Sequence, residues 1–409
     1  MKKILIIHQN MEVGGAKTSL LGLLNSFDYS KVSIDIFFYE QKGELYDLIP
    51  DQVNILQEIP IYKALVSPVK EAIKDKQLKI SILRIFTKFR CYIQDKLYSY
   101  GDLGYVLKQF YHYNALPLLP FIQGEYDMAI SFNDPHFILG NKVHAKIKMG
   151  WFHTDFSGIK YNSKLEEKMW SKCDYAVNVS ECCKQAFDEK HPYMKNKSIV
   201  IENILSKELV KKRADMFDAE SEILQDGSVR LLSVGRFSDA KNFDNVPIIC
   251  QEILKSGIDV KWYLIGYGSD EELIKHRIIE AGMEKQVIIL GKKENPYPYI
   301  KACDIYIQPS RYEGKCVAVR EAQILGKPVI ITNYATSSSQ LKDGYDGVIV
   351  PMDNKGCAKG IVSVIRDKKL QQKLVENESK SDYTNVEETR KLYQLMEDSM
   401  LEECLNAVC

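Results

Sequence analysis

The sequence predicts an α/β protein of two domains, each built on a parallel β-sheet that helices cover on both faces. The chain has 409 residues, more than one hydrophobic core usually supports. Short, nearly continuous apolar runs alternate with helical patterns, as expected for parallel strands buried on both faces. A polar stretch at 215–227 separates two such series. We therefore expect two doubly wound domains that face each other across a cleft.

The N-terminal domain is expected at residues 1–213. It opens with a strand at Lys3–His8, a glycine loop at 12–15 and a helix at Ala16–Asn25. The remaining apolar runs predict further strands at Val32–Tyr39, Tyr126–Phe132, Ile147–His153, Tyr175–Val179 and Ser198–Ile204.

The C-terminal domain is expected at residues 214–385, where the same alternation starts again. Strands are predicted at Arg230–Gly235, Val260–Ile265, Val287–Leu290, Ile305–Ile307, Val329–Thr332 and Gly347–Val350. Helices are predicted at Asn245–Lys255, Asp270–Ala281, Pro298–Cys303, Cys316–Leu325 and Ala358–Asn377. A last helical segment at 386–409 is expected to return towards the N-terminal domain.

Bulk charge gives no sign of a nucleic-acid partner. The 55 basic residues balance the 55 acidic residues, and 45% hydrophobic content is ordinary for a soluble globular protein. The ten cysteines contain no C-x-x-C motif, which favours reduced thiols over a metal site or a disulfide framework. The N-terminal apolar run is too short for a signal peptide, and no stretch approaches the roughly 20 apolar residues of a membrane span. A cytoplasmic location is expected.

Residues 61–121 interrupt the alternation with a basic helical insertion. From 63 to 108 there are ten basic and four acidic side chains, a net charge of +6 in a chain whose total is zero. Apolar and aromatic residues are interleaved with them. Such a stretch is typical of a peripheral contact with an anionic membrane at its cytoplasmic face, while a helical insertion with a solvated charged face is the alternative.

Glycine and basic residues follow the first strand of each domain. Gly14 and Gly15 allow a ligand to approach the backbone closely, although a tight turn without a ligand would use the same residues. Gly235 precedes Arg236 and Lys241 at the carboxyl end of a strand, where open α/β sheets bind ligands. A guanidinium and an ammonium together suit a diphosphate, and a solvent-exposed pair is the alternative.

Two glutamates flank the start of the helix expected at Cys316–Leu325. Glu313 lies in the preceding loop, and Glu321 lies about one and a half turns into the helix. A ligand over this helix N-terminus could contact both carboxylates while its phosphates meet the amides near Gly314–Val317. Ionised carboxylates only accept hydrogen bonds, which suits sugar or ribose hydroxyls.

His153 ends a strand of the N-terminal domain, with Asp155 close by to set its tautomer. It could hydrogen-bond a donor sugar or a phosphate oxygen. A structural histidine is the alternative interpretation.

Taken in order, these motifs resemble the glycosyltransferase family 4 pattern of retaining GT-B enzymes, above all the bacterial members that build capsule, exopolysaccharide or lipopolysaccharide. The residues that carry the resemblance are Gly14-Gly15, His153, Gly235-Arg236, Lys241, Gly266-Tyr267-Gly268, Glu313 and Glu321. The resemblance covers essentially the whole chain and is strongest from Val234 to Pro351.

The resemblance implies a role for each matching residue. Arg236 and Lys241 would bind the donor diphosphate, Glu313 the donor sugar and Glu321 the ribose, with His153 as a further catalytic residue. The loop at 291–296 would lie beside the base. The remaining donor-binding positions would be Gly14, Gly15, Gly235, Gly266, Lys292, Gly314, Lys315, Cys316 and Val317. No metal and no cofactor would be required.

The expected reaction is transfer of a hexose or N-acetylhexosamine from a nucleotide-sugar, with UDP favoured over GDP, to a saccharide or lipid-linked saccharide, with retention of configuration. One alternative keeps the fold but is a sugar-nucleotide epimerase or hydrolase, for which few further acid–base residues stand out. The other is a non-catalytic sugar-nucleotide binder.

Overall fold

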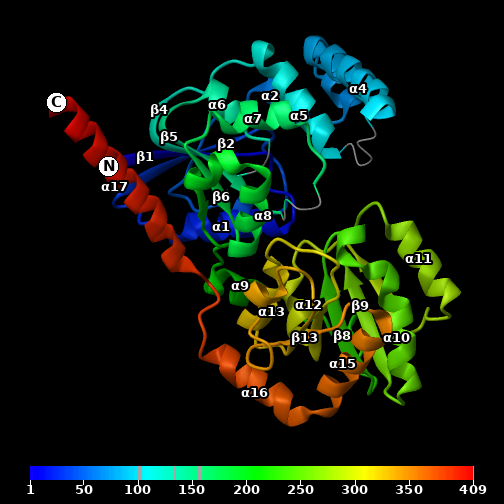
Figure 1. The fold of residues 1–409 in the computed structure, drawn as a ribbon. Helices are drawn as coiled ribbons and strands as arrows, with labels where there is room; N and C mark the ends of the chain where they lie inside the picture. Colours follow the sequence, from blue (N-terminus) through cyan, green and yellow to red (C-terminus); the bar gives the residue numbers. More distant parts are fainter. Residues whose placement is uncertain (99–103, 133–134, 155, 157–158, 409) are drawn as a thin grey trace. The chain divides into compact units, whose positions relative to one another are not determined.

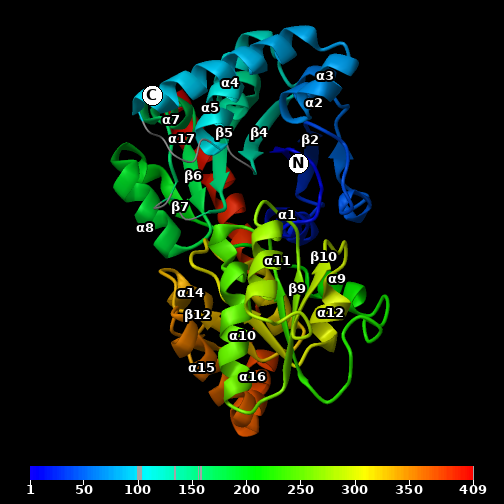
Figure 2. The same cartoon turned by 90° about the vertical axis from the view of Figure 1, so that its right-hand side faces the viewer.

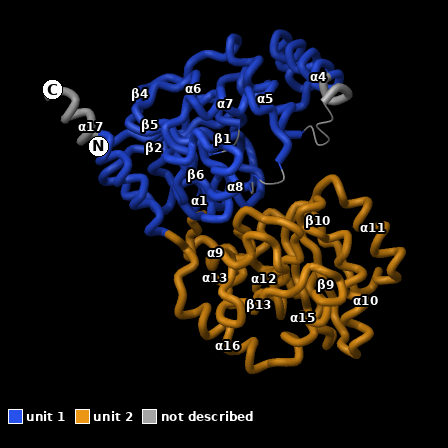
Figure 3. Tube along the Cα trace, in the orientation of Figure 1, with its two compact units in different colours: residues 1–202, 386–409 blue, residues 203–385 orange. Residues whose placement is uncertain are grey.

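The structure is a computed structural model that describes residues 1–98, 104–132, 135–154, 156 and 159–408; side chains are described except at 94–98 and 400–408. Within this range the chain divides into two compact units (Figure 3). Unit 1 comprises Met1–Glu202 and Val386–Cys409, and unit 2 comprises Asn203–Asn385. Figures 1 and 2 show an α/β arrangement in both.

Unit 1 contains, among the described residues, a seven-stranded parallel sheet of order β3-β2-β1-β4-β5-β6-β7. The order reverses between β1 and β4, so the chain runs outwards from the centre of the sheet in both directions. Its strands are β1 (Lys2–His8), β2 (Val32–Phe38), β3 (Asn54–Ile55), β4 (Glu125–Ser131), β5 (His144–Phe152), β6 (Tyr175–Asn178) and β7 (Ser198–Val200). The short edge strand β3 is the one that the apolar pattern did not predict.

The helices of unit 1 surround this sheet. They are α1 (Gly15–Ser26), α2 (Pro60–Val66), α3 (Val69–Lys74), α4 (Leu78–Tyr98), α5 (Gly104–Ala115), α6 (Phe137–Lys142), α7 (Ser163–Trp170), α8 (Glu181–Lys190) and α17 (Thr389–Val408). The basic insertion is helical: α4 packs against α2, α3 and α5 (Figures 1 and 2).

The last helix, α17, is part of unit 1. The hydroxyls of Thr389 and Ser26 lie 2.6 Å apart, and the Tyr393 hydroxyl accepts a hydrogen bond of 2.8 Å from the amide of Asp28. The segments that connect the units run together, since the amide of Leu205 donates to the carbonyl of Thr384. The chain therefore leaves unit 1 and re-enters it at neighbouring points.

Unit 2 contains, within the described range, a six-stranded parallel sheet of order β10-β9-β8-β11-β12-β13. Its strands are β8 (Val229–Val234), β9 (Val260–Ile265), β10 (Val287–Gly291), β11 (Ile305–Gln308), β12 (Val329–Thr332) and β13 (Val348–Val350). Its helices are α9 (Lys207–Ala214), α10 (Val246–Lys255), α11 (Glu271–Glu280), α12 (Tyr297–Ala302), α13 (Val317–Ile324), α14 (Ser337–Gln340), α15 (Asn354–Arg366) and α16 (Lys368–Ser379).

The first boundary between the units differs from the sequence expectation. Residues 203–213 were expected in the N-terminal domain, but they belong to unit 2. The reason is burial: Leu205, Val210 and Ala214 join the core that contains Leu232 and Tyr263. A polar linker at 215–227 therefore marks a loop inside unit 2, not the junction.

Candidate functional site

The candidate site of unit 2 lies where its strand order reverses. The neighbours β8 and β11 continue in opposite directions across the sheet, and the loops that follow them meet at the carboxyl edge. Open α/β sheets bind their ligands at such switch points. Arg236 and Lys241 follow β8, and Glu313 follows β11. Both sequence motifs therefore lie at the switch point.

Glycines bring the loops after β8, β9 and β10 into contact. The amide of Gly235 donates to the carbonyl of Ile265, and the amide of Gly266 donates to that of Gly291, both at 3.0 Å. A Cβ atom on Gly266 would lie 1.8 Å from the carbonyl oxygen of Gly235. Only glycine fits there, because real Cβ atoms do not approach backbone oxygens so closely.

Polar contacts also join the loop after β8 to the loop after β11. The guanidinium of Arg311 binds both carboxylate oxygens of Asp244, at 2.9 and 2.7 Å, and its backbone amide donates to the carbonyl of Ala240. Asn242 takes a left-handed conformation (φ 59°), which asparagine tolerates better than most residues, and donates to the carbonyl of Pro309 at 2.9 Å. The two loops are thus held together independently of any ligand.

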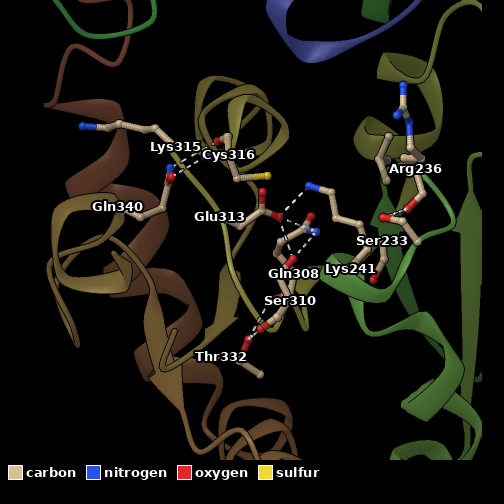
Figure 4. Close-up of polar contacts among 12 residues, drawn as sticks. Ser233, Arg236, Lys241, Gln308, Ser310, Glu313, Lys315, Cys316, Thr332 and Gln340 are labelled. Carbon is tan, nitrogen blue, oxygen red and sulfur yellow. Dashed lines mark hydrogen bonds and ion pairs between the residues drawn. The ribbon is translucent and has the colours of Figure 1, made fainter. Parts of the chain in front are cut away.

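Lys241 and Glu313 meet at the centre of this junction (Figure 4). The distance from Lys241 Nζ to Glu313 Oε1 is 2.5 Å, and the two side chains are 18% and 10% exposed. Burial is the largest single effect and lowers the pKa of Lys241, but the charge and hydrogen bond of Glu313 together with Cys316 outweigh it and raise this pKa to about 12. Lys241 is therefore a fixed positive charge at neutral pH.

Further side chains orient the carboxylate of Glu313. Ser310 Oγ donates to Oε1 at 2.6 Å, and Gln308 Nε2 lies 3.4 Å from the same atom. Thr336 Oγ1 donates to the backbone carbonyl of Glu313 at 2.8 Å. Among the described residues, every hydrogen bond to this carboxylate falls on Oε1 (Figure 4), so Oε2 is left to accept from a ligand hydroxyl.

These supporting residues come from two neighbouring strands. The Tyr306 hydroxyl donates to Gln308 at 2.7 Å on β11, and Thr332, at the end of β12, donates to the carbonyl of Ser310 at 2.5 Å. Sequence reasoning missed Gln308, Ser310 and Thr332 as site residues. The available signal was their position at the carboxyl ends of buried strands.

Arg236 differs from Lys241 in being exposed. Its side chain extends away from the Lys241–Glu313 pair in Figure 4. No hydrogen bond or ion pair of its guanidinium occurs in the part of the chain that the structure describes. Its charge nevertheless acts on Lys241, whose pKa it lowers slightly. The two cations are close enough to interact, but the protein pairs only one of them with an acid.

The amide expected to meet phosphates at the start of α13 is already bonded. The amide of Cys316 donates to Gln340 Oε1 at 2.7 Å, and Gln340 Nε2 returns a bond of 3.2 Å to the carbonyl of Cys316. Gln340, on α14, thus caps the helix start, which the sequence did not predict. Gly314, Lys315 and Val317 are buried around it, with the carbonyl of Lys315 accepting from Asn203.

Glu321 lies in the fifth position of α13 and is 5% exposed. Its Oε1 accepts a hydrogen bond of 2.7 Å from the Tyr297 hydroxyl on α12. Burial raises the pKa of Glu321 to about 7, although the Tyr297 hydrogen bond and the charge of Arg213 oppose the rise. The carboxyl group therefore gains or loses its proton near neutral pH. The predicted contact of Glu321 with a ribose stays a prediction.

Lys292 lies near the glycine loop after β9. Its ammonium is 5.3 Å from the centre of the Tyr267 ring, and Tyr267 is 41% exposed between Gly266 and Gly268. Cation–π contact holds the lysine over this loop. A base-binding role for the 291–296 loop is not tested by these contacts.

In unit 1 the predicted residues lie at the carboxyl edge of its own sheet. Gly14 precedes α1, which begins at Gly15, and a Cβ atom on Gly14 would meet only the Lys17 side chain, at 3.8 Å. Packing therefore does not require glycine at position 14. His153 Nε2 donates to the carbonyl of Phe132 at 3.1 Å, which in a neutral ring makes Nδ1 an acceptor. Asp155 lies outside the described residues.

Neither a metal centre nor a membrane span was found in the described part of the chain. It contains no group of three or more His, Cys, Asp or Glu side chains placed to hold a metal ion. Its described helices are too short or too polar to cross a bilayer. The arrangement can instead provide a fixed cation, a second exposed cation and two carboxyl groups at one sheet edge.

Comparison with known proteins gives this site a context. Residues 216–381, which lie within unit 2, match the model of the family "Glycosyl transferases group 1". Over 179 residues the chain is 25% identical to N-acetylgalactosamine-N,N'-diacetylbacillosaminyl-diphospho-undecaprenol 4-alpha-N-acetylgalactosaminyltransferase of Campylobacter jejuni, covering 42% of this chain and 48% of that protein. Over 141 residues it is 26% identical to UDP-Gal:alpha-D-GlcNAc-diphosphoundecaprenol alpha-1,3-galactosyltransferase of Escherichia coli, covering 34% and 36%.

The whole chain resembles solved structures more extensively than it resembles these relatives, of which it spans half the length or less. The structure of Anabaena Alr3699/HepE in complex with UDP and glucose aligns over 97% of this chain and all of that one, with a TM-score of 0.68 and 15% identity. This likeness establishes the GT-B fold. The fold and the domain match at 216–381 together support a GT-B glycosyltransferase.

Proposed function

We propose that the protein is a retaining glycosyltransferase of family 4 that moves a hexose or N-acetylhexosamine from a UDP-sugar to a lipid-linked saccharide in bacterial surface polysaccharide synthesis. The observation that carries the proposal is the partly buried Lys241–Glu313 pair at the switch point of unit 2. The domain match and the names of the relatives, which act on diphospho-undecaprenol-linked sugars, agree with it.

Lys241 and Arg236 would stabilise the departing nucleoside diphosphate. Charge builds up on the phosphates as the bond to the sugar breaks, and a fixed cation in a partly buried site stabilises that charge more than water does. Because Glu313 keeps Lys241 protonated, no proton has to be taken up before reaction. We propose that these side chains take the role that a divalent ion has in other transferases, so that no metal is required.

Glu313 would orient the donor sugar. Its Oε1 atom is held by Lys241, Ser310 and Gln308, so its position is set before a ligand binds. Its Oε2 atom can then accept a hydrogen bond from a sugar hydroxyl. Fixing the sugar over the leaving diphosphate is what a retaining transfer on the leaving-group face would require.

We propose that the protein works at the cytoplasmic face of the membrane, in contact with it through α4. The outer face of this helix carries large exposed side chains at helical spacing: Ile82, Ile85, Phe86, Phe89, Tyr92 and Ile93. Ile82, Phe86 and Phe89 are 66%, 64% and 63% exposed. The opposite face, with Ile80 and Cys91, is buried in unit 1.

Charge favours an anionic lipid surface as the partner of this face. Lys79, Lys88 and Arg90 are exposed on α4, and residues 78–93 contain no acidic side chain. Each basic residue near an anionic membrane contributes about 1 kcal/mol, and the apolar side chains add their burial in the headgroup region. A lipid-linked acceptor would be met at the same surface.

The transfer proposal is tested with purified full-length protein, UDP-sugars and polyprenyl-diphosphate-linked saccharides. Replacing Lys241 by Gln should lower kcat/KM by roughly 10²- to 10³-fold, as loss of one preorganised charge does elsewhere. Lys301→Gln is the matched control, because Lys301 forms an ion pair with Asp215 and is 58% exposed. Equal activity of the two variants would refute the assigned role of Lys241.

Product analysis separates the alternatives. NMR of the product anomer tests retention, and incubation without acceptor tests for epimerisation or hydrolysis. A protein that binds UDP but turns over no donor with any acceptor would be a sugar-nucleotide binder. Thermal shifts with UDP, GDP and ADP rank the nucleotides, since a bound ligand stabilises the native state by mass action.

The membrane proposal is tested by co-sedimentation with vesicles. Binding to phosphatidylglycerol vesicles should exceed binding to phosphatidylcholine vesicles and should fall as salt rises. Phe86→Asp combined with Phe89→Asp should abolish it, and no folding defect is expected because both side chains are exposed. Unchanged binding of this variant would show that α4 is not the contact.

A further inference from the structure

Unit 1 contains a cavity of about 170 Å³ at the carboxyl ends of its first two strands. His8 ends β1, and Tyr39 follows β2. Helices α2, α4 and α5, which pack together in Figures 1 and 2, provide the rest of the wall. The lining residues are Ile7, His8, Gln9, Tyr39, Leu65, Val66, Arg84, Lys108, Tyr111 and His112.

Two cations face this cavity, and its lining has no acidic residue. Arg84 is 8% exposed, and its Nη1 atom donates to the carbonyls of Ala64 and Ser67 at 2.7 and 2.6 Å. Its Nε atom is buried without a hydrogen-bond partner. Within the described residues no carboxylate pairs with Arg84 or with Lys108, which is exposed at the cavity.

A buried guanidinium without a counter-ion is unusual. Arginine keeps its charge in proteins, and although burial lowers the pKa of Arg84, the group cannot escape its cost by losing a proton. Two backbone carbonyls and the Tyr111 ring, 5.4 Å from the guanidinium carbon, offset part of that cost. An anion bound in the cavity would complete the pairing.

The histidines add polarity without charge. His112 is 7% exposed, and burial, together with Lys108 and Arg84, lowers its pKa to about 3. Burial likewise lowers the pKa of His8 well below its usual range. Both rings are therefore neutral at pH 7. The Nδ1 atom of His112 is buried without a hydrogen-bond partner in the described structure, so it is available to a ligand hydroxyl.

We propose that this cavity binds a sugar that carries one anionic group, a carboxylate or a phosphate. Arg84 and Lys108 pair with the anion, His112 meets a hydroxyl, and the side chains of Tyr39, Leu65 and Val66 cover the ring. The volume is well below that of a site for a drug-sized ligand, which suits a single sugar unit. The inference rests on the proposed transfer, for which it names the acceptor class: an acidic saccharide.

The experiment measures binding of soluble probes to the full-length protein by ligand-observed NMR titration without nucleotide. The probes are glucuronate, glucose 6-phosphate, glucose and inorganic phosphate. Either acidic sugar should bind at least about tenfold more tightly than glucose, as one charge-assisted hydrogen bond would give. The tighter of the two identifies the anion. Equal affinity for all three sugars would overturn the inference.

Variants locate the binding. Lys108→Gln should weaken the acidic sugars about tenfold, while Lys164→Gln, which removes an exposed helical lysine on α7, should not. Arg84→Met should abolish the preference for acidic sugars. Arg84→Met also loses two hydrogen bonds to backbone carbonyls and could fail to fold for that reason. In that case His112→Phe is the second variant. Wild-type affinity in both Lys108→Gln and His112→Phe would refute the site.

The outcomes also separate this inference from the transfer proposal. Binding of UDP and its dependence on Lys241 are measured on the same protein. UDP binding without a preference for acidic sugars would overturn only the cavity assignment. A preference for acidic sugars without UDP binding would overturn the assigned donor site and would not affect the cavity assignment. Inorganic phosphate binding as tightly as glucose 6-phosphate would refute the part of the inference that concerns the sugar.

Discussion

Glu321→Gln should make the protein more stable at neutral and alkaline pH, and less able to bind its donor. Glu321 is 5% exposed, and burial raises its pKa from 4.5 to about 7. A carboxyl group whose folded-state pKa is raised holds its proton more tightly in the folded chain. The free energy of unfolding therefore falls as pH rises from about 4.5 to about 7, and is level above that.

The magnitude follows from the two pKa values. They differ by roughly 2.5 pKa units, and each pKa unit corresponds to about 1.36 kcal/mol, so ionising the buried carboxyl lowers the free energy of unfolding by about 3 kcal/mol. Glutamine is uncharged and can still accept the Tyr297 hydrogen bond, so the variant avoids this cost. The free energy of unfolding of the variant should exceed that of the parent by about 3 kcal/mol at pH 8 and by less than about 1 kcal/mol at pH 5.

Urea unfolding at pH 5, 6, 7 and 8 measures the effect, followed by circular dichroism and tryptophan fluorescence. Glu284→Gln, the same substitution at an exposed position, is the control. UDP affinity of Glu321→Gln should fall at pH 8 if the carboxylate binds a ribose. A stability difference that did not grow between pH 5 and pH 8 would refute the reasoning about burial.

Three further outcomes follow from single features. Gly268→Ala should destabilise unit 2 by about 3 kcal/mol or more, because a Cβ atom would lie 2.1 Å from the carbonyl oxygen of Phe237; thermal unfolding measures it, and wild-type stability would contradict it. Gly14→Ala should change stability by less than about 1 kcal/mol, so a loss of turnover in that variant would report a ligand contact at the loop. Burial, with a smaller contribution from Asp346, raises the pKa of Glu378 from 4.5 to about 9, so in urea unfolding Glu378→Gln should match the parent at pH 4 and exceed it by a margin that grows up to about pH 9. A difference in stability that did not grow between pH 4 and pH 9 would contradict the last expectation.

The sequence alone determined the fold class and most of the strands. Buried parallel strands leave continuous apolar runs, and that signal is local, so Lys2–His8 and Val260–Ile265 could be found without a structure. The spacing of Arg236, Lys241 and Glu313 after such runs also placed them at strand ends. The linker, by contrast, was misplaced, because a polar segment looks the same in a loop and at a domain junction.

Only the tertiary structure decided which of these residues meet. Lys241 and Glu313 are 72 residues apart, and they pair because strand order makes β8 and β11 neighbours. Sequence spacing could not show that Gln340 bonds the amide of Cys316 while Arg236 is left exposed. Nor could it show that Arg84, one of ten basic residues in a helical insertion, is buried beside His112. Such contacts depend on how helices and strands pack, and the periodicity of a single element contains no information about its partners.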